Sequence, residues 1–339
     1  MVANGAYRTP FWLPGGHAQT IYPSFVRRPE VEYRRQRVDT PDGDFVDFDW
    51  LDGPARPGAP LVVLFHGLEG SSRSHYALAL MSRLAAIGWR GVVPHFRGCS
   101  GEPNRLPRAY HSGDYAEVGW MLETIRRLEP DTTIFAAGVS LGGSALLNWL
   151  GREENGAGDV LAAAAAVSTP LDLVAAGLSI GQGLNRIYAR HFLSTLVPKA
   201  LAMARRFPGA LDAAAVARAD TMHRFDDVVT APLHGFGDAD DYWKRASSKP
   251  WLKAITVRTL VLNARNDPFI PADSLPTRAQ ASGAVTLEQP DGGGHGGFLA
   301  ARFPGSLDWL PRHLTDFFES LSPCSCPQTS SRPTTSAAS

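Results

Sequence analysis

Short, continuous apolar runs alternate along this sequence with stretches in which apolar residues recur at helical spacing. The run LVVLF at residues 61–65 suits a strand buried on both faces, because such a strand has apolar side chains at every position. The stretch at 76–87 follows, with Leu80, Leu84 and Ile87 on one helical face. Repeated strand–helix–strand units need parallel strands with helical crossovers. The predicted class is therefore α/β, with helices on both faces of the sheet.

The same alternation covers most of the chain. Strands are predicted at 61–65, 91–94, 132–137, 161–167, 259–262 and 285–287, and helices at 76–87, 118–128, 145–150 and 307–321, the last broken at Pro311. Residues 31–50 alternate in the manner of exposed antiparallel strands. The alternation stops over about 171–251, where Ala-rich stretches at 199–206 and 211–218 predict helices.

We interpret residues 171–251 as a helical cap inserted in one α/β domain that spans 1–322. An insertion at this point of a parallel sheet lies above the carboxyl ends of the strands, where a lid over a pocket belongs. Its apolar residues are expected mainly to pack onto the sheet, with a lipid-accepting pocket as the alternative: Leu178, Ile180, Leu184, Ile187, Phe192 and Leu196. The Ser/Thr/Pro-rich tail, 323–339, is predicted to be disordered.

The charge balance and the apolar content limit the function classes. The chain has 33 Lys and Arg residues against 33 Asp and Glu residues, so it has no net charge with which to hold a nucleic-acid backbone. The longest apolar stretch, 160–167, is far shorter than the roughly 20 residues that span a bilayer. The N-terminus lacks the basic and apolar regions of a secretory signal. We therefore expect a cytoplasmic protein without nucleic-acid partners or stable membrane insertion.

The cysteines and the acidic and histidine residues predict neither disulfides nor a metal site. The chain has 3 cysteines, Cys99, Cys324 and Cys326, which we interpret as free thiols in a reducing compartment. No cluster of His, Cys, Asp and Glu has the spacing of metal ligands. The loop after 61–65 lacks both the ending of a P-loop and a G-x-G-x-x-G pattern. No cofactor is expected.

A G-x-S-x-G pattern at 138–142 marks the candidate nucleophile, Ser140. The pattern follows the predicted strand at 132–137 directly and opens into the predicted helix at 145–150. In such a strand–turn–helix the serine occupies a strained turn, and its glycine neighbours avoid clashes with the flanking elements. The turn also places the N–H of Leu141 at a helix N-terminus, where it can stabilise an anion.

A serine hydroxyl needs a base that is held by a third group. Asp267 lies on the loop directly after the strand at 259–262, and we interpret it as the acid. His295 lies between glycines after the strand at 285–287, where the glycines let its ring reach toward a partner, and we interpret it as the base. The second oxyanion donor is expected after the strand at 61–65, where a His-Gly pair aims the N–H of Leu68 at the site.

With these residues in place, the chain resembles the α/β-hydrolase superfamily and, within it, the YheT-like branch, also called the AB hydrolase 4 family. The matching stretches extend over about residues 10–320: GGHAQT at 15–20, HGLEGSS at 66–72, FRGCSG at 96–101, GVSLGG at 138–143, FDD at 225–227, TAPLHGF at 230–236, NARNDPF at 263–269 and GGHGGF at 293–298. The resemblance implies an eight-stranded, mostly parallel sheet, a helical insertion and a triad of Ser140, Asp267 and His295.

The expected function is hydrolysis of carboxylic esters through an acyl-enzyme, with a small-molecule ester or a lipid as substrate. Relatives in this branch include esterases, lipid-acting hydrolases and enzymes that pass acyl groups to alcohols. Acyl transfer to an alcohol and hydrolysis of monoacylglycerol or phospholipid therefore stay open as alternatives. A catalytically silent binding protein is the alternative from another class. The sequence indicates neither the acyl chain length, nor the leaving alcohol, nor the oligomeric state.

Overall fold

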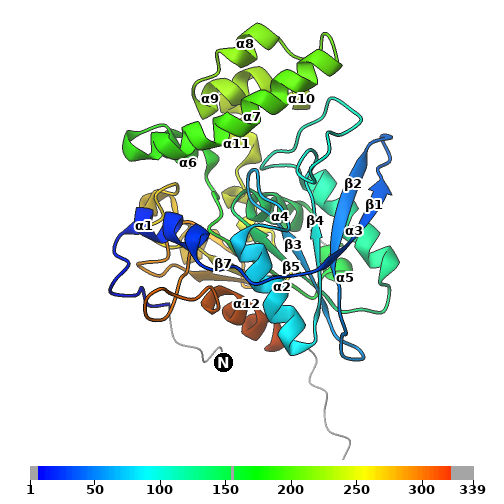
Figure 1. Cartoon of the computed structure of the whole chain (residues 1–339), viewed down its shortest axis with the longest axis vertical. Helices are drawn as coiled ribbons and strands as arrows, with labels where there is room; N and C mark the ends of the chain where they lie inside the picture. Colours follow the sequence, from blue (N-terminus) through cyan, green and yellow to red (C-terminus); the bar gives the residue numbers. More distant parts are fainter. Residues whose placement is uncertain (1–6, 154–155, 322–339) are drawn as a thin grey trace, which may run out of the picture.

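The computed structural model describes residues 7–153 and 156–321, and its centre is one eight-stranded sheet (Figure 1). The strand order is β1-β2-β4-β3-β5-β6-β7-β8. The strands are β1 Tyr33–Asp39, β2 Phe45–Leu51, β3 Leu61–Phe65, β4 Arg90–Pro94, β5 Ile134–Val139, β6 Ala163–Val167, β7 Thr259–Leu262 and β8 Val285–Glu288. β1 pairs antiparallel with β2 and β2 antiparallel with β4, and every other pairing is parallel. The predicted class and the predicted mostly parallel sheet are confirmed.

Helices cover both faces of the sheet and follow the strand alternation. The helices are α1 Gly16–Ile21, α2 His75–Ile87, α3 Tyr115–Leu128, α4 Leu141–Arg152, α5 Ala157–Val160, α6 Leu173–Ile180, α7 Arg186–Arg206, α8 Ala213–Ala217, α9 Met222–Phe225, α10 Ala231–His234, α11 Ala239–Ala246 and α12 Trp309–Glu319. Short 3-10 turns are η1 Tyr22–Phe25, η2 Gly183–Asn185, η4 Lys249–Lys253, η5 Ala272–Ser274 and η6 Arg278–Gln280, and η3 Asp226–Thr230 is a π-helical turn.

The central strand β3 shows how the two core layers arise. Leu61, Val63 and Phe65 belong to the cluster that contains α3 and α4, whereas Val62 and Leu64 belong to the cluster that contains α2 and α12. Successive side chains of a strand point to opposite faces, so a continuous apolar run feeds both layers.

Two predicted elements differ from the structure. β2 is buried over nearly its whole length, because it lies inside the sheet between β1 and β4 and is not an exposed strand. Pro311 does not break the last helix, because it occupies the third position of α12. The first N–H groups of a helix have no partner within the helix, so proline costs little there.

Helices α6 to α11 form a group beyond one end of the sheet (Figure 1). The Ser179 hydroxyl donates to the carbonyl of Pro268, in the loop that follows β7, so this is the carboxyl end of the strands. The group has an apolar cluster of its own, which includes Leu193, Leu196 and Phe225. The expectation that its apolar residues pack mainly onto the sheet is wrong for three of them, which are exposed: Leu178, Leu184 and Ile187.

Two remaining expectations concern the chain ends and membranes. The predicted disordered tail, with Cys324 and Cys326, lies outside the described residues. Within the described ranges, no helix combines the length and apolar character that crossing a bilayer requires.

Candidate active site

Ser140 lies in the turn between β5 and α4 with φ 54° and ψ −121°. Non-glycine residues rarely adopt positive φ, so tight surroundings must hold this turn. A Cβ on Gly142 would lie 2.4 Å from the carbonyl oxygen of Phe65, at the end of β3, and one on Gly138 would lie 2.6 Å from the carbonyl oxygen of Gly142. No side chain therefore fits at Gly138 or Gly142, where the turn packs closely against its surroundings. The turn presents Ser140 Oγ at the carboxyl end of the sheet.

The structure brings Ser140, His295 and Asp267 together. His295 Nε2 lies 2.8 Å from Ser140 Oγ, and His295 Nδ1 lies 2.8 Å from Asp267 Oδ2. The side chain of Asp267 has no exposed surface, and its Oδ1 accepts a hydrogen bond from the N–H of Phe269 at 2.8 Å. An ionised carboxylate only accepts hydrogen bonds, so the proton of neutral His295 belongs on Nδ1. Nε2 is then free to accept the proton of the serine hydroxyl.

The loop that carries His295 is held by α1, a contact that the sequence analysis did not identify. The N–H of Gly293 donates to Gln19 Oε1 at 2.7 Å, and the N–H of His295 donates to Thr20 Oγ1 at 2.9 Å. A Cβ on Gly297 would lie 2.0 Å from the carbonyl oxygen of Gln19. The glycines around His295 thus allow the backbone of α1 to approach closely, because they have no side chains. They also leave the imidazole ring room to turn. The GGHAQT stretch at 15–20 was the available signal, but nothing in it predicts a position beside residue 295.

The residues on either side of Leu68 are held by the hydroxyl groups of two partly buried tyrosines. The N–H of Gly67 donates to the hydroxyl of Tyr76 at 2.8 Å, and the N–H of Glu69 donates to the hydroxyl of Tyr110 at 2.7 Å. Burial raises the pKa of both tyrosines, which keeps their hydroxyls protonated. A Cβ on Gly67 would lie 3.2 Å from Ser140 Cβ, so this loop runs directly beside the serine.

The N–H groups of Leu68 and Leu141 have no acceptor in the part of the chain that the structure describes. Leu141 is the first residue of α4, where a helix offers its N–H no carbonyl partner. The neighbours of Leu68 are both engaged, whereas its own N–H is not. Two unsatisfied donors flanking a serine hydroxyl can hold a negatively charged oxygen.

His66, directly before this loop, is a fully buried positioning residue. Its Nε2 accepts from the N–H of Phe96 at 3.1 Å, and its Nδ1 lies 2.8 Å from the carbonyl oxygen of Gly67, to which it donates. Burial lowers the pKa of His66 to about 3, with the nearby His95 as a smaller cause. A neutral ring fits this pair of contacts, because one nitrogen accepts and the other donates.

The described His, Cys, Asp and Glu residues form no group of three that could hold a metal ion. What the site offers is a hydroxyl, a base with an oriented proton, a buried carboxylate and two free N–H donors. Such an arrangement can make the serine oxygen nucleophilic and stabilise the anion that its attack on a carbonyl creates.

Comparison with known proteins shows which family and which folds this chain is similar to. A family model described as alpha/beta hydrolase fold matches residues 60–301. The chain is 38% identical over 307 residues to the putative esterase YheT of Escherichia coli, covering 89% of each chain. It is 30% identical over 329 residues to the human phospholipase ABHD3, covering 94% of this chain and 80% of that protein. Among solved structures, the Pyrococcus furiosus esterase PF2001 matches with a TM-score of 0.55 at 13% identity, covering 86% of this chain and 91% of that chain.

Proposed function

The chain belongs to the alpha/beta hydrolase fold family, in its YheT-like branch, and on that premise we propose that it hydrolyses carboxylic esters through an acyl-enzyme. The observation that carries the proposal is the hydrogen-bonded chain from Ser140 through His295 to Asp267, with both contacts at 2.8 Å. The names of two relatives, a putative esterase and a phospholipase, support chemistry at an ester.

Acylation begins when Ser140 Oγ attacks the ester carbonyl carbon and His295 Nε2 takes the hydroxyl proton. Asp267 holds the imidazole in the required tautomer and stabilises the imidazolium that forms. The carbonyl oxygen becomes an anion, and the N–H groups of Leu68 and Leu141 hold it. Removal of one such donor typically costs about 100-fold to 1,000-fold in rate. Collapse of this intermediate expels the alcohol, which takes its proton from His295.

Deacylation repeats these roles with water. His295 Nε2 takes a proton from water, the hydroxide attacks the acyl carbon, and the same two N–H groups hold the second oxyanion. The acid leaves and Ser140 recovers its proton from His295. An alcohol in place of water would give a new ester, so product analysis with and without added alcohol separates hydrolysis from acyl transfer.

A lipid ester is the second candidate substrate. The 30% identity with the human phospholipase ABHD3, over nearly the whole of this chain, is the observation that favours it. A lipid substrate would differ in its acyl and alcohol parts, but every site residue would keep the role assigned above.

The test replaces Ser140 by alanine and follows release of p-nitrophenol from short-chain p-nitrophenyl esters. We expect wild-type protein to turn over and Ser140→Ala to lose about a millionfold in kcat, because the three side chains act as a unit. Ser144→Ala is the matched control, since Ser144 is buried in α4 and donates to the carbonyl of Pro170. A Ser140→Ala protein that is folded and retains most of the activity contradicts the proposal.

A further inference from the structure

The turn that carries Leu68 has a backbone conformation that its sequence does not favour. The N–H of Gly70 donates to the carbonyl of Gly67 at 2.9 Å, which closes a β-turn with Leu68 and Glu69 at its centre. Glu69 has a φ of 55°, a value that glycine adopts readily and other residues rarely adopt. Contacts made by the glutamate must therefore hold the turn in this shape.

Glu69 is held from two sides. From the main domain, the hydroxyl of Tyr110 accepts the N–H of Glu69 at 2.7 Å and donates its own proton to Glu69 Oε1 at 3.1 Å. From the inserted helices, Lys199 Nζ on α7 donates to the same carboxylate oxygen at 2.9 Å. The Glu69 side chain is 10% exposed, against 49% for Lys199, and within the described ranges no other basic residue pairs with this carboxylate. The ion pair therefore joins α7 to the residue next to Leu68.

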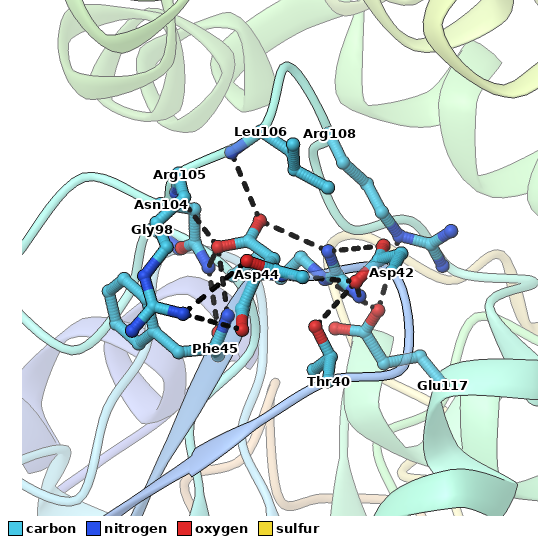
Figure 2. Close-up of polar contacts among 12 residues, drawn as sticks. Thr40, Asp42, Asp44, Phe45, Gly98, Asn104, Arg105, Leu106, Arg108 and Glu117 are labelled. Atoms are coloured by element: carbon cyan, nitrogen blue, oxygen red, sulfur yellow. Dashed lines mark hydrogen bonds and ion pairs between the residues drawn. The ribbon is translucent and has the colours of Figure 1, made fainter.

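The two partners of Glu69 differ in how firmly they are placed. Tyr110 ends the loop at 97–110, which a buried polar network attaches to the start of β2. In this network the fully buried Asp44 accepts from Asn104 Nδ2 at 2.9 Å and from the N–H of Arg105 at 2.8 Å (Figure 2). Buried hydrogen-bonded networks make their surroundings rigid. Lys199 is instead half-exposed on an inserted helix, so its contact with the turn depends on where α7 lies.

The charge of Glu69 matters because of its place in the chain. Glu69 directly follows Leu68, so its carboxylate adds a negative charge near the ester oxygen that becomes an anion when the serine attacks. Like charges repel strongly where little water screens them. The ester itself is uncharged, so this repulsion raises the energy of the transition state and not that of the bound substrate. The ammonium group of Lys199, 2.9 Å from the carboxylate, offsets the charge.

We propose that Glu69 and Lys199 are a pair of positioning residues for the oxyanion donor. Glu69 holds the turn that carries the N–H of Leu68, and Lys199 on the inserted helix α7 holds Glu69 and neutralises it. The inference rests on the proposed function, because the N–H of Leu68 has this role only if Ser140 attacks a carbonyl. It makes stabilisation of the transition state depend on the place of the inserted helices, although Lys199 takes part in no bond-making step.

The test measures kcat and KM for a short p-nitrophenyl ester. Lys199→Met leaves the carboxylate of Glu69 unpaired, and we expect kcat to fall about tenfold or more with little change in KM. The double variant Glu69→Gln/Lys199→Met also removes the carboxylate charge, so it is expected to recover most of that loss. Lys199→Arg keeps the charge and is expected to keep most of the wild-type kcat. Lys244→Met is the matched control, because it removes an exposed lysine from another inserted helix, α11, and it is expected to keep the wild-type kcat.

A purely structural ion pair gives a different pattern, because removal of its second partner does not restore kcat. A double variant no faster than Lys199→Met, or wild-type kcat in a folded Lys199→Met, overturns this inference and leaves the proposed function intact. If wild-type protein hydrolyses no ester, or a folded Ser140→Ala retains most of the activity, the proposed function fails and the inference fails with it. Should Lys199→Met not fold, Lys199→Gln keeps a hydrogen-bond donor without the charge, and wild-type kcat in that variant overturns the inference.

Discussion

Thr20 is far from the candidate base, His295, in sequence, but it supports that residue through one hydrogen bond. Its Oγ1 accepts the N–H of His295 at 2.9 Å, while its own proton goes to the carbonyl of Gly16 at 2.7 Å. The backbone of the histidine is thereby fixed relative to α1. Positioning by such a bond affects the reacting geometry, because a small displacement of a base weakens every step in which it takes part.

Replacement of Thr20 by valine keeps the shape of the side chain and removes the acceptor. The N–H of His295 then lacks a partner, which costs on the order of 1–3 kcal/mol. We expect kcat for a short p-nitrophenyl ester to fall about tenfold or more with little change in KM. Thr20→Ser keeps the hydroxyl and is expected to keep most of the wild-type kcat. Equal kcat in Thr20→Val and wild type would show that this bond does not position the base.

At the scale of elements, the inserted helices are joined by a buried carboxyl group. Asp226 in η3 accepts from Thr230 Oγ1 at 2.6 Å and from Trp243 Nε1 on α11 at 2.8 Å. The ring of Trp243 in turn packs on Gly177 of α6, where a Cβ would lie 2.6 Å from it. Burial raises the pKa of Asp226 to about 6. The folded state therefore holds a proton here that the unfolded chain releases at lower pH.

Because the folded and unfolded states bind this proton differently, the free energy of unfolding is expected to depend on pH. Between the ordinary pKa of 3.8 and about 6 the folded protein binds more protons than the unfolded chain, so the contribution of Asp226 to stability falls as pH rises through this window. Asp226→Asn mimics the protonated group and removes the dependence. The free energy of unfolding of the variant minus that of wild type, from urea titrations, should rise by about 2 kcal/mol from pH 4 to pH 7. A difference that is constant with pH would contradict the account.

The elements also show what sequence patterns can and cannot predict. Continuous apolar runs such as 61–65 predicted the buried strands, because burial on both faces leaves no polar position. The pattern at 31–50 predicted strands but gave β2 the wrong exposure, since burial depends on which strands flank it. Proline within a helical pattern predicts a break at Pro311, because the sequence does not show that α12 begins at Trp309.

At the scale of the whole molecule, parallel strands gather distant loops at one end of the sheet. β3, β5 and β7 are followed by Leu68, Ser140 and Asp267, which is why the order of strands and loops already placed these residues near each other. The contribution of α1 could not be predicted, because α1 precedes the sheet and its position follows from tertiary packing alone. The place of α7 depends likewise on an inserted segment whose orientation no local pattern specifies.

Under the proposed function, Ser140 becomes covalently acylated because His295 activates it. Treatment with a fluorophosphonate, followed by mass spectrometry of the peptides, tests it most directly, since the reagent forms a stable adduct only with an activated serine. We expect one adduct, on Ser140, and its loss in a folded His295→Ala variant. No adduct in wild-type protein, an adduct on another serine, or undiminished labelling of Ser140 without His295 would contradict it.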